Sequence, residues 1–541
     1  MRWPLNDRIA RMKTYTAVIL IIIACLFLRL PIMDVPFERD EGGYAYAAWR
    51  MMEGEVLYRD VFDLKPPGVF VFYLTALLLF GHSVLAIHIM LTLFVIAGAV
   101  FLFLIGRELK DSPVGMLAAF SYLVFCACAA FPGSSANTEH FMNTAVIMSV
   151  YFLIKALKTA KAGPILCCGA LNGIAFLIKQ PAVVNVIFAV SVFLAVSFSE
   201  RRPQKYILKM AGVMLAGFFV PVIISVAAFA AIGALKDYIF CTYLYSASYS
   251  SLVDFQQALK YLRFNSGDVF LITGPLFAVS LASIFYGRKD RVNACCVMWL
   301  VFSILGVSIG FVFRRHYFLQ IIPALSLLFA YGLRHILERY PLRRPAVYFA
   351  VSAVVLMPAL ASSISNYGCT PESLSKLTSG RMNPFVESVR IAEYIKENTS
   401  AEDTILVIGS EPQVYFYSKR RSAARYMYFY PLLLPSGWAP RMQNEAMAEI
   451  RRNKPAFIIN INERFSLLIN KKSHMFIMKE LNRMVQAEYE AVGCAGPSLD
   501  LMSSYYFFDE EFELVKHRYE NIMNISLSEN KPKVTIYRRM Q

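Results

Sequence analysis

The feature that most constrains the fold is a series of long apolar runs that carry few charges. The first begins near Thr14 and the last ends near residue 364. Each is roughly 17–25 residues long, the length that an α-helix needs to cross a hydrocarbon core of ~30 Å. Lipid offers the backbone no hydrogen bonds, so only helices and closed barrels span it. The runs therefore predict a polytopic α-helical membrane protein.

About eleven runs are long enough to span a bilayer. The segment Val69–Phe80 is apolar but only about twelve residues long, which favours an interfacial or re-entrant helix. The expected spans are residues 14–33, 84–106, 113–131, 138–157, 164–180, 181–199, 207–232, 268–286, 292–313, 317–335 and 345–364.

Charges in the connecting loops predict the orientation. No small-residue cleavage site follows the first apolar run, so we expect an uncleaved helix with a cytoplasmic N-terminus. Alternate loops are then basic and cytoplasmic, in line with the positive-inside bias, at residues 107–110, 155–161, 200–205, 287–291 and 334–345. Orientation and anionic lipid headgroups explain the formal net charge of +16 better than nucleic acid does.

The character of the chain changes after residue 365. We expect a transmembrane module at 1–365, with a first outer loop at 34–83, and an extracytoplasmic α/β domain at 366–541. Periodicity predicts helices at 385–397 and 445–452, strands at 404–409 and 456–460, and a last edge strand at 534–537. The ten cysteines show no metal-binding spacing, and pairing of Cys369 with Cys494 stays open.

The stretch from Phe37 to Gly68 has the composition of an active-site loop. It combines the acidic pair Asp40-Glu41, the flexible Gly42-Gly43, an aromatic run beginning at Tyr44, and the basic, rigid Lys65-Pro66-Pro67. A simple connector between two membrane helices rarely needs that mixture. We predict that this loop carries the chemistry.

Further ionisable residues fall at the same outer border of the bilayer, where clustered charges indicate a functional site. Each has a plainer interpretation: Glu139 suits the start of a helix, Lys179 could snorkel to the interface, and the adjacent arginines could bind anionic lipid. We nevertheless predict that the basic residues converge on a phosphate and that a second carboxylate and its neighbours orient the acceptor or a cation. The candidates are Lys65, Lys179, Arg314 and Arg315 for the phosphate, and Glu139, His316 and Tyr317 for the acceptor side.

A carboxylate that faces cations at the water–lipid boundary suits sugar transfer from a lipid phosphate. The reaction needs a base for the acceptor hydroxyl and cations for the departing phosphate. Arginine binds phosphate through two nitrogens and lysine neutralises it as a point charge. The sequence contains no Walker or GxGxxG motif, so a nucleotide donor is not indicated.

The loop resembles that of the GT-C superfamily of membrane glycosyltransferases, in the protein-O-mannosyltransferase and aminoarabinose-transferase branch. The matching residues are Asp40-Glu41, Tyr44 and Lys65-Pro66, together with the RRHYFLQIIPALSLL stretch at 314–328. The Gly42-Gly43 pair stands where some relatives carry bulkier residues.

This resemblance implies the chemistry of the site. It makes Asp40 the catalytic base beside Glu41, and gives Tyr44 and Lys65 contacts to the donor phosphate. The implied donor is a polyprenyl-phosphate sugar, the acceptor a lipid, glycan or protein, and the outcome inversion at the anomeric carbon. The implied location is the bacterial cytoplasmic membrane. A divalent cation is compatible with the motif and not required by it.

Three other classes remain as alternatives. A transporter or flippase of lipid-linked sugars predicts inverted repeats, broken helices and charges near the midplane, whereas these charges lie at one border. A membrane-anchored binding protein would leave the Asp40 loop unexplained. A polymerase or ligase of lipid-linked glycans shares the donor chemistry and the topology, so sequence does not separate it from a transferase.

Overall fold

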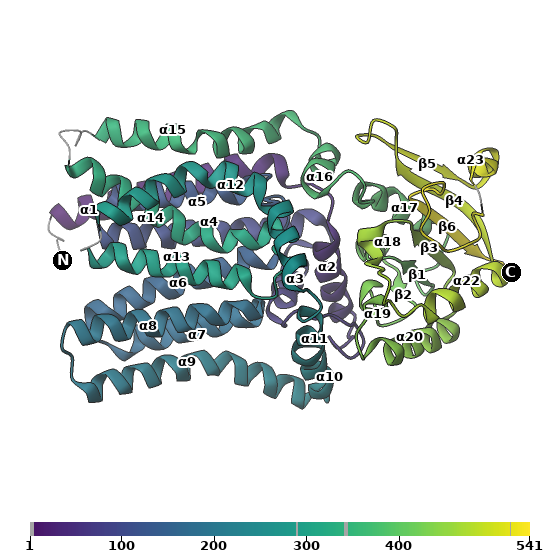
Figure 1. Ribbon diagram of the computed structural model, residues 1–541, viewed down its shortest axis with the longest axis horizontal. Helices are drawn as coiled ribbons and strands as arrows, with labels where there is room; N and C mark the ends of the chain where they lie inside the picture. Colours follow the sequence, from purple (N-terminus) through teal and green to yellow (C-terminus); the bar gives the residue numbers. More distant parts are fainter. Residues whose placement is uncertain (1–4, 288–289, 340–344, 520, 541) are drawn as a thin grey trace.

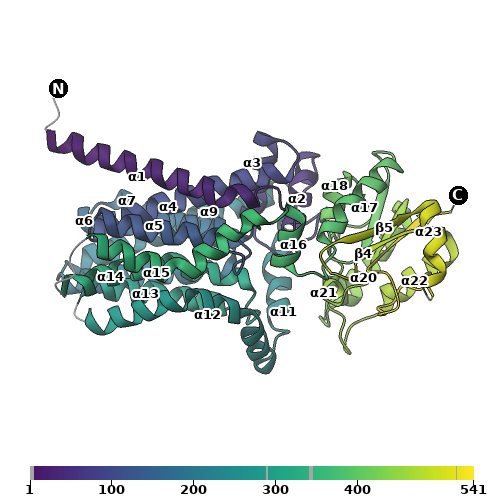
Figure 2. The same cartoon turned by 90° about the horizontal axis from the view of Figure 1, so that it is seen from above.

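The computed structural model describes residues 5–287, 290–339, 345–519 and 521–540. It has two parts: a bundle of long helices, and an α/β region that lies against one end of that bundle (Figure 1). The N-terminal end of the first helix lies at the opposite end of the bundle from the α/β region (Figures 1 and 2). We call residues 369–540 the C-terminal region.

The bundle agrees with the predicted spans. Within the described residues, nine helices are long and apolar enough to cross a membrane, and two shorter apolar helices, α5 and α7, match the other two predicted spans. Together these bundle helices are α1 (Leu5–Arg29), α4 (Val84–Leu109), α5 (Ser112–Ala127), α6 (Thr138–Thr159), α7 (Ala162–Ile178), α8 (Val183–Ser199), α9 (Gln204–Ala231), α12 (Phe255–Tyr286), α13 (Arg291–Ser308), α14 (Ile322–Arg339) and α15 (Pro345–Ile364). The predicted basic loops at 287–291 and 334–345 lie partly outside the described residues.

Small residues allow the helices of the bundle to pack closely, because lipid provides no hydrophobic drive between helices. A Cβ atom on Gly169 of α7 would lie 2.0 Å from the carbonyl oxygen of Met214 in α9. A Cβ atom on Gly115 of α5 would lie 2.3 Å from the carbonyl oxygen of Phe103 in α4. Any larger side chain at Gly169 or Gly115 would force the helices apart.

Shorter elements cover the end of the bundle that faces the C-terminal region. The thirteen-residue helix α3 is among them, and its length agrees with the short apolar segment expected at 69–80. These elements are α2 (Arg39–Met52), α3 (Gly68–Phe80), α10 (Leu235–Ile239), α11 (Ser246–Ser250) and the 3₁₀ helix η4 (Arg315–Ile321).

The C-terminal region contains one mixed six-stranded sheet in the order β2-β1-β3-β6-β4-β5. Strands β2, β1 and β3 are parallel to one another, whereas β6, β4 and β5 pair antiparallel. The strands are β1 (Thr404–Ile408), β2 (Arg421–Ser422), β3 (Phe457–Ile461), β4 (Tyr489–Pro497), β5 (Ser504–Phe508) and β6 (Val534–Arg539). The helices are α16 (Pro371–Ser379), α17 (Phe385–Glu397), α18 (Gln413–Ser418), α19 (Tyr430–Leu433), α20 (Ala439–Asn453), α21 (Arg464–Leu467), α22 (Phe476–Glu488) and α23 (Asp509–Val515).

The predicted elements of this region are present, with one error of position. The segment 534–537 was expected to be the last edge strand, but β6 lies between β3 and β4 in the interior of the sheet. Strands β4 and β5 add to its other side, and the sequence pattern did not predict them. Cys369 and Cys494 are both free thiols.

Candidate active site

The predicted catalytic loop begins with the helix α2, whose first turn is capped on both sides. The side chain of Glu38 accepts a hydrogen bond from the backbone nitrogen of Glu41, and Glu41 accepts one from the backbone nitrogen of Glu38. Reciprocal caps of this kind satisfy two of the backbone donors at a helix start. Asp40 therefore projects from a helix end that its neighbours hold in place.

Glu41 is buried and engaged by three elements. Besides the cap, its Oε1 accepts from the backbone nitrogen of Ala136 at 2.6 Å and lies 3.0 Å from Nε2 of His88. The other ring nitrogen of His88 lies 2.7 Å from the carbonyl oxygen of Met33. These contacts direct Glu41 into the protein, so the two carboxylates of the acidic pair face different surroundings.

The backbone of Lys65 is fixed on both sides. Its nitrogen donates to Oδ1 of Asp63 at 2.8 Å, and its carbonyl oxygen accepts from the hydroxyl of Tyr58 at 2.7 Å. The following Pro66-Pro67 restricts the chain further before α3 begins. The lysine side chain is thereby presented from a rigid turn.

A buried ion pair joins α6 to the end of α7. Lys179, directly after α7, donates to Glu139 in the first turn of α6, and both side chains are buried. The ammonium also lies 3.5 Å from the centre of the Tyr317 ring, a cation–π contact. Lys179 therefore does not snorkel to the lipid interface, which was its plainer interpretation.

The segment before η4 has a strained backbone. Phe311 and Phe313 adopt left-handed φ angles of 57° and 46°, and Gly310 one of 82°. Non-glycine residues in this region cost about 1–3 kcal/mol each and persist where the surroundings determine them. The strain lies immediately before Arg314, whose side chain reaches the cavity described next.

One cavity of about 230 Å³ lies between the end of the bundle and the C-terminal region. Its polar lining comes from segments that are far apart in the sequence, and its remaining lining is aromatic, aliphatic or backbone. The lining residues include Glu38, Arg39, Asp40, Lys65, Lys179, Gln180, Ser246, Tyr249, Ser250, Arg314, His316, Tyr317, Tyr430, Phe465 and Leu468.

The charges in this cavity are only partly neutralised. The carboxylate of Asp40 and the cationic groups of Lys65 and Arg314 have no hydrogen-bond or ion-pair partner within the described residues. Burial lowers the pKa of Lys65, but Tyr317, Asp40 and nearby carboxylates more than offset it, so this pKa stays above its ordinary value. The lysine is accordingly protonated and available to an anion.

Asp63 is a second carboxyl group beside this site. Burial raises its pKa to about 7, opposed by the hydrogen bond from the Lys65 backbone. Its second oxygen, Oδ2, is buried without a hydrogen-bond partner in the described part of the chain. Asp63 therefore changes its protonation state near neutral pH, and no sequence motif marks it.

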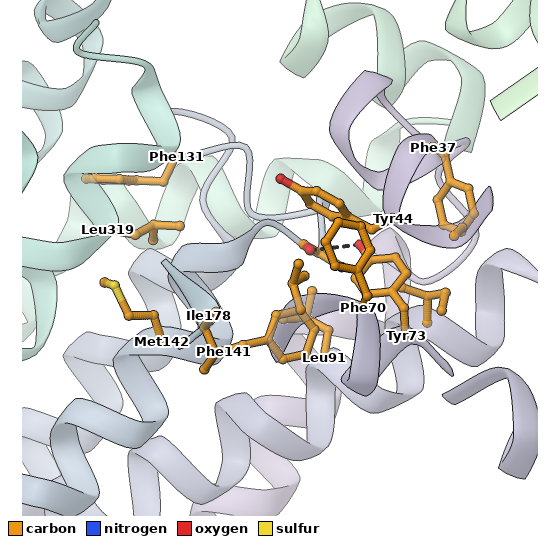
Figure 3. Close-up of a cluster of buried hydrophobic side chains, with 14 of the residues drawn as sticks. Phe37, Tyr44, Phe70, Tyr73, Leu91, Phe131, Phe141, Met142, Ile178 and Leu319 are labelled. Atoms are coloured by element: carbon orange, nitrogen blue, oxygen red, sulfur yellow. Dashed lines mark hydrogen bonds between the residues drawn. The ribbon is translucent and has the colours of Figure 1, made fainter. Parts of the chain in front are cut away.

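Tyr44 of α2 is fully buried. Its ring packs edge-to-face against Phe70 and Tyr73 at centroid distances of 5.6 and 5.5 Å (Figure 3). Burial, and then the charge of Asp40, raises the pKa of its hydroxyl well above the ordinary value. Among the described residues this hydroxyl has no hydrogen-bond partner, and Tyr44 does not line the cavity.

The structure thus brings together some of the predicted site residues and separates others. Arg315 pairs with Asp268 at 3.2 Å, while Glu139 does not line the cavity but pairs with Lys179, which does. The predicted residues that line the cavity are Asp40, Lys65, Lys179, Arg314, His316 and Tyr317. Those that do not are Glu41, Tyr44, Glu139 and Arg315.

Sequence reasoning missed the contribution of the C-terminal region. In the aromatic run from Tyr426 to Tyr430, Tyr426 and Tyr428 are buried. Tyr430, however, lines the cavity together with Phe465 and Leu468. No motif marks these residues, because they become neighbours of Asp40 only through the packing of the two parts.

The arrangement can bind an anion and abstract a proton. The cavity lining contains the unpaired cations Lys65 and Arg314, and the unpaired carboxylate of Asp40 at the start of α2, among the residues that the structure describes. Within the described residues, no group of three or more His, Cys, Asp and Glu side chains is arranged to hold a metal ion.

Comparisons with known proteins agree with this architecture. Residues 64–225 match the sequence model of the family described as dolichyl-phosphate-mannose-protein mannosyltransferase. Comparison with curated proteins finds no match.

Solved structures match nearly the whole chain at low identity. ArnT from Cupriavidus metallidurans bound to undecaprenyl phosphate is 15% identical, with a TM-score of 0.60 over 96% of this chain and 97% of that one. The oligosaccharyltransferase AglB from Archaeoglobus fulgidus, in complex with an inhibitory peptide and a dolichol-phosphate, is 11% identical, with a TM-score of 0.53 over 93% and 75%. The chain therefore has the fold of the GT-C membrane glycosyltransferases, as its sequence resemblance implied.

Proposed function

We propose that this GT-C chain transfers a sugar from a polyprenyl-phosphate donor to an acceptor hydroxyl, with Asp40 as the general base. The observation that carries the proposal is that one cavity is lined both by the carboxylate of Asp40 and by the cationic groups of Lys65 and Arg314, none of which has a partner among the described residues. Support for the donor class comes from the neighbours, since ArnT was solved with undecaprenyl phosphate and AglB with a dolichol-phosphate.

In this proposal the donor phosphate binds at the cationic side of the cavity. Lys65 and Arg314 contact its oxygens directly, and Lys179 contributes charge that Glu139 partly neutralises. Burial of the cavity between two protein parts strengthens these interactions relative to water. His316 and Tyr317 lie beside Lys179, where they can orient either substrate.

The transfer step is a single displacement. Asp40 takes the proton from the acceptor hydroxyl as its oxygen forms a bond to the anomeric carbon. The bond between that carbon and the phosphate oxygen breaks, and the polyprenyl phosphate leaves with both electrons. Attack opposite to the leaving group inverts the anomeric centre. The cations stabilise the charge that develops on the phosphate.

The proposed location of the cavity is the extracytoplasmic face of a bacterial cytoplasmic membrane. Basic loops at the other end of the bundle support this orientation. Reporter fusions after Arg202 and at the C-terminus should report opposite sides of the membrane. Reports from the same side would overturn the orientation.

Incubation of the purified protein, reconstituted into lipid vesicles, with labelled undecaprenyl-phosphate hexoses and pentoses and candidate acceptors tests the reaction. We expect label to move to an acceptor and undecaprenyl phosphate to accumulate. A polymerase or ligase would instead yield products of increasing glycan length. Label that crosses the bilayer without release of undecaprenyl phosphate would indicate a flippase and overturn the proposal.

A further inference from the structure

Two segments of the C-terminal region line the cavity, a third is hydrogen-bonded to both of them, and all three follow parallel strands. Ser410 and Glu411 follow β1, the segment that leads to Tyr430 follows β2, and α21 follows β3. In α/β sheets, ligands bind outside the carboxyl ends of parallel strands, because the loops there converge on one edge. The carboxyl ends of the parallel strands lie toward the bundle, so this side of the sheet is the one at which a ligand is expected to bind.

Arg39 connects this edge to the start of α2. Its Nε donates to the carbonyl oxygen of Ser410 at 2.7 Å, and its Nη2 contacts Oε1 of Glu411 at 2.7 Å. The Glu411 side chain is fully buried, whereas that of Arg39 is 16% exposed. Arg39 directly precedes Asp40, so this pair bonds the C-terminal region to the residue next to the proposed base.

The same segment holds the aromatic side of the cavity. The second carboxylate oxygen of Glu411 accepts from the hydroxyl of Ser466 at 2.5 Å, which fixes α21 and hence Phe465. The Ser410 hydroxyl donates to the carbonyl oxygen of Ser466 at 2.6 Å and accepts from the backbone nitrogen of Tyr430 at 3.3 Å. Both carboxylate oxygens of Glu411 therefore accept hydrogen bonds, one from Arg39 of the bundle and the other from Ser466 in the cavity wall.

The contact between α2 and the C-terminal region leaves no space for adjustment. A Cβ atom at Gly42 would lie 2.6 Å from the backbone nitrogen of Gln413, and one at Gly43 would lie 1.8 Å from the hydroxyl oxygen of Tyr428. This packing explains the Gly42-Gly43 pair that distinguishes the loop from relatives with bulkier residues. The helix that carries Asp40 is therefore seated directly on α18.

We propose that Glu411 is a positioning residue for sugar transfer: through Arg39 it sets the place of Asp40, and through Ser466 it sets the cavity wall that faces Asp40. Removing the pair shifts the base relative to the acceptor while the phosphate-binding cations keep their places, since Lys65 and Arg314 are held by other segments. This positioning role rests on the proposed function only in the kcat measurement, because hydrogen exchange and phosphate binding can be measured without sugar transfer.

The test compares the full-length variants Glu411→Gln and Arg39→Ala with Arg421→Ala. Arg421 is a matched control, because it also bridges the two parts, through Glu55 at 2.9 Å, but does not line the cavity. Three quantities are measured: hydrogen exchange of the 38–46 peptide, affinity for undecaprenyl phosphate, and kcat with labelled undecaprenyl-phosphate sugars. If Glu411→Gln does not accumulate, Arg39→Ala breaks the same pair from its more exposed side.

In Glu411→Gln and Arg39→Ala, we expect the backbone amides of the 38–46 peptide to exchange hydrogen faster than in wild type. The kcat of both variants should fall at least tenfold, while their affinity for undecaprenyl phosphate stays within about twofold of wild type. Arg421→Ala should resemble wild type in all three. Exchange and kcat like those of Arg421→Ala would overturn the proposal. Lost undecaprenyl phosphate affinity in Arg39→Ala alone would make Arg39 a phosphate ligand and also overturn it.

The failure of the proposed function has a different signature. Wild-type protein that releases no undecaprenyl phosphate would contradict the transferase proposal, and the exchange of the 38–46 peptide would still decide whether Glu411 positions α2. Unchanged exchange in both variants would then reject the positioning role by itself.

Discussion

The two walls of the cavity differ in their chemistry. The bundle wall supplies the unpaired charges, namely Asp40, Lys65 and Arg314. The C-terminal wall supplies Tyr430, Phe465 and Leu468, and none of its described residues places a charged side chain in the cavity. Under the proposed function, the two parts therefore have separate roles: the bundle binds the phosphate and supplies the base, and the C-terminal region forms the uncharged wall opposite them.

The largest expected effect comes from the bundle wall. Asp40→Asn keeps the size of the side chain but removes the proton acceptor, so transfer should fall by about 10²–10⁴-fold. Undecaprenyl phosphate binding should persist. Release of undecaprenyl phosphate from a labelled donor measures the effect.

Two neighbouring variants sharpen that result. Glu41→Gln should cost less, because Glu41 is directed toward His88 and Ala136 rather than into the cavity. Asp60→Asn, on the same loop but outside the cavity, should behave like wild type. Full activity of Asp40→Asn with an inactive Glu41→Gln would assign the base to the other carboxylate.

The second effect concerns Asp63, a buried residue of the same loop that does not line the cavity. Because burial raises the pKa of Asp63 to about 7, the folded protein binds a proton there that the unfolded chain releases near pH 4. Its contribution to stability is therefore complete at low pH and is lost as the pH rises toward 7, by up to about 4 kcal/mol. Asp63→Asn should flatten this decline.

Thermal unfolding in detergent at pH 5 and pH 8 measures this difference. The wild type should lose more stability between the two pH values than Asp63→Asn does. Asparagine keeps an oxygen for the Lys65 backbone, so the loop should retain its shape. Equal pH dependence in the two proteins would show that Asp63 is ionised in the folded state throughout this range.

A third prediction tests the cationic side of the bundle wall. Lys65→Met and Arg314→Met should each weaken undecaprenyl phosphate binding by about 10–100-fold, since a hydrogen bond to a charged group contributes about 1.5–3 kcal/mol. Arg315→Met is the matched control, because Arg315 is adjacent in sequence but pairs with Asp268 outside the cavity. Binding to protein in lipid nanodiscs is the measurement, and equal losses at Arg314 and Arg315 would indicate general electrostatic attraction.

The smallest effect is expected at the C-terminal wall. Phe465 is 61% exposed although it lines the cavity, so Phe465→Ala should leave the fold intact. Loss of one aromatic contact should raise the acceptor KM by about two- to tenfold, with undecaprenyl phosphate affinity unchanged. Phe476→Ala removes a similarly exposed ring away from the cavity and serves as the control. If Phe465→Ala instead lowered the affinity for undecaprenyl phosphate, the C-terminal wall would also contribute to donor binding, which would contradict the separate roles of the two walls.

Local pattern was sufficient for much of the fold. Apolar run length predicted the spanning helices, and periodicity predicted α17, β1 and β3, because each of these signals depends on neighbours within one element. Interior placement of β6 and pairing of β4 with β5 were not predictable, since strand order depends on contacts between distant segments.

The membrane bundle and the loop with Asp40 and Lys65 could be predicted from the amino-acid sequence, since lipid imposes the helix length and charges at its border are costly. Tertiary folding was needed to place the basic residues: Arg314 lines the cavity, whereas the adjacent Arg315 pairs with Asp268 outside it. The contacts between the bundle and the C-terminal region likewise cannot be predicted from the local sequence. No local pattern relates Arg39 to Glu411, because they are 372 residues apart and meet only when the two parts pack.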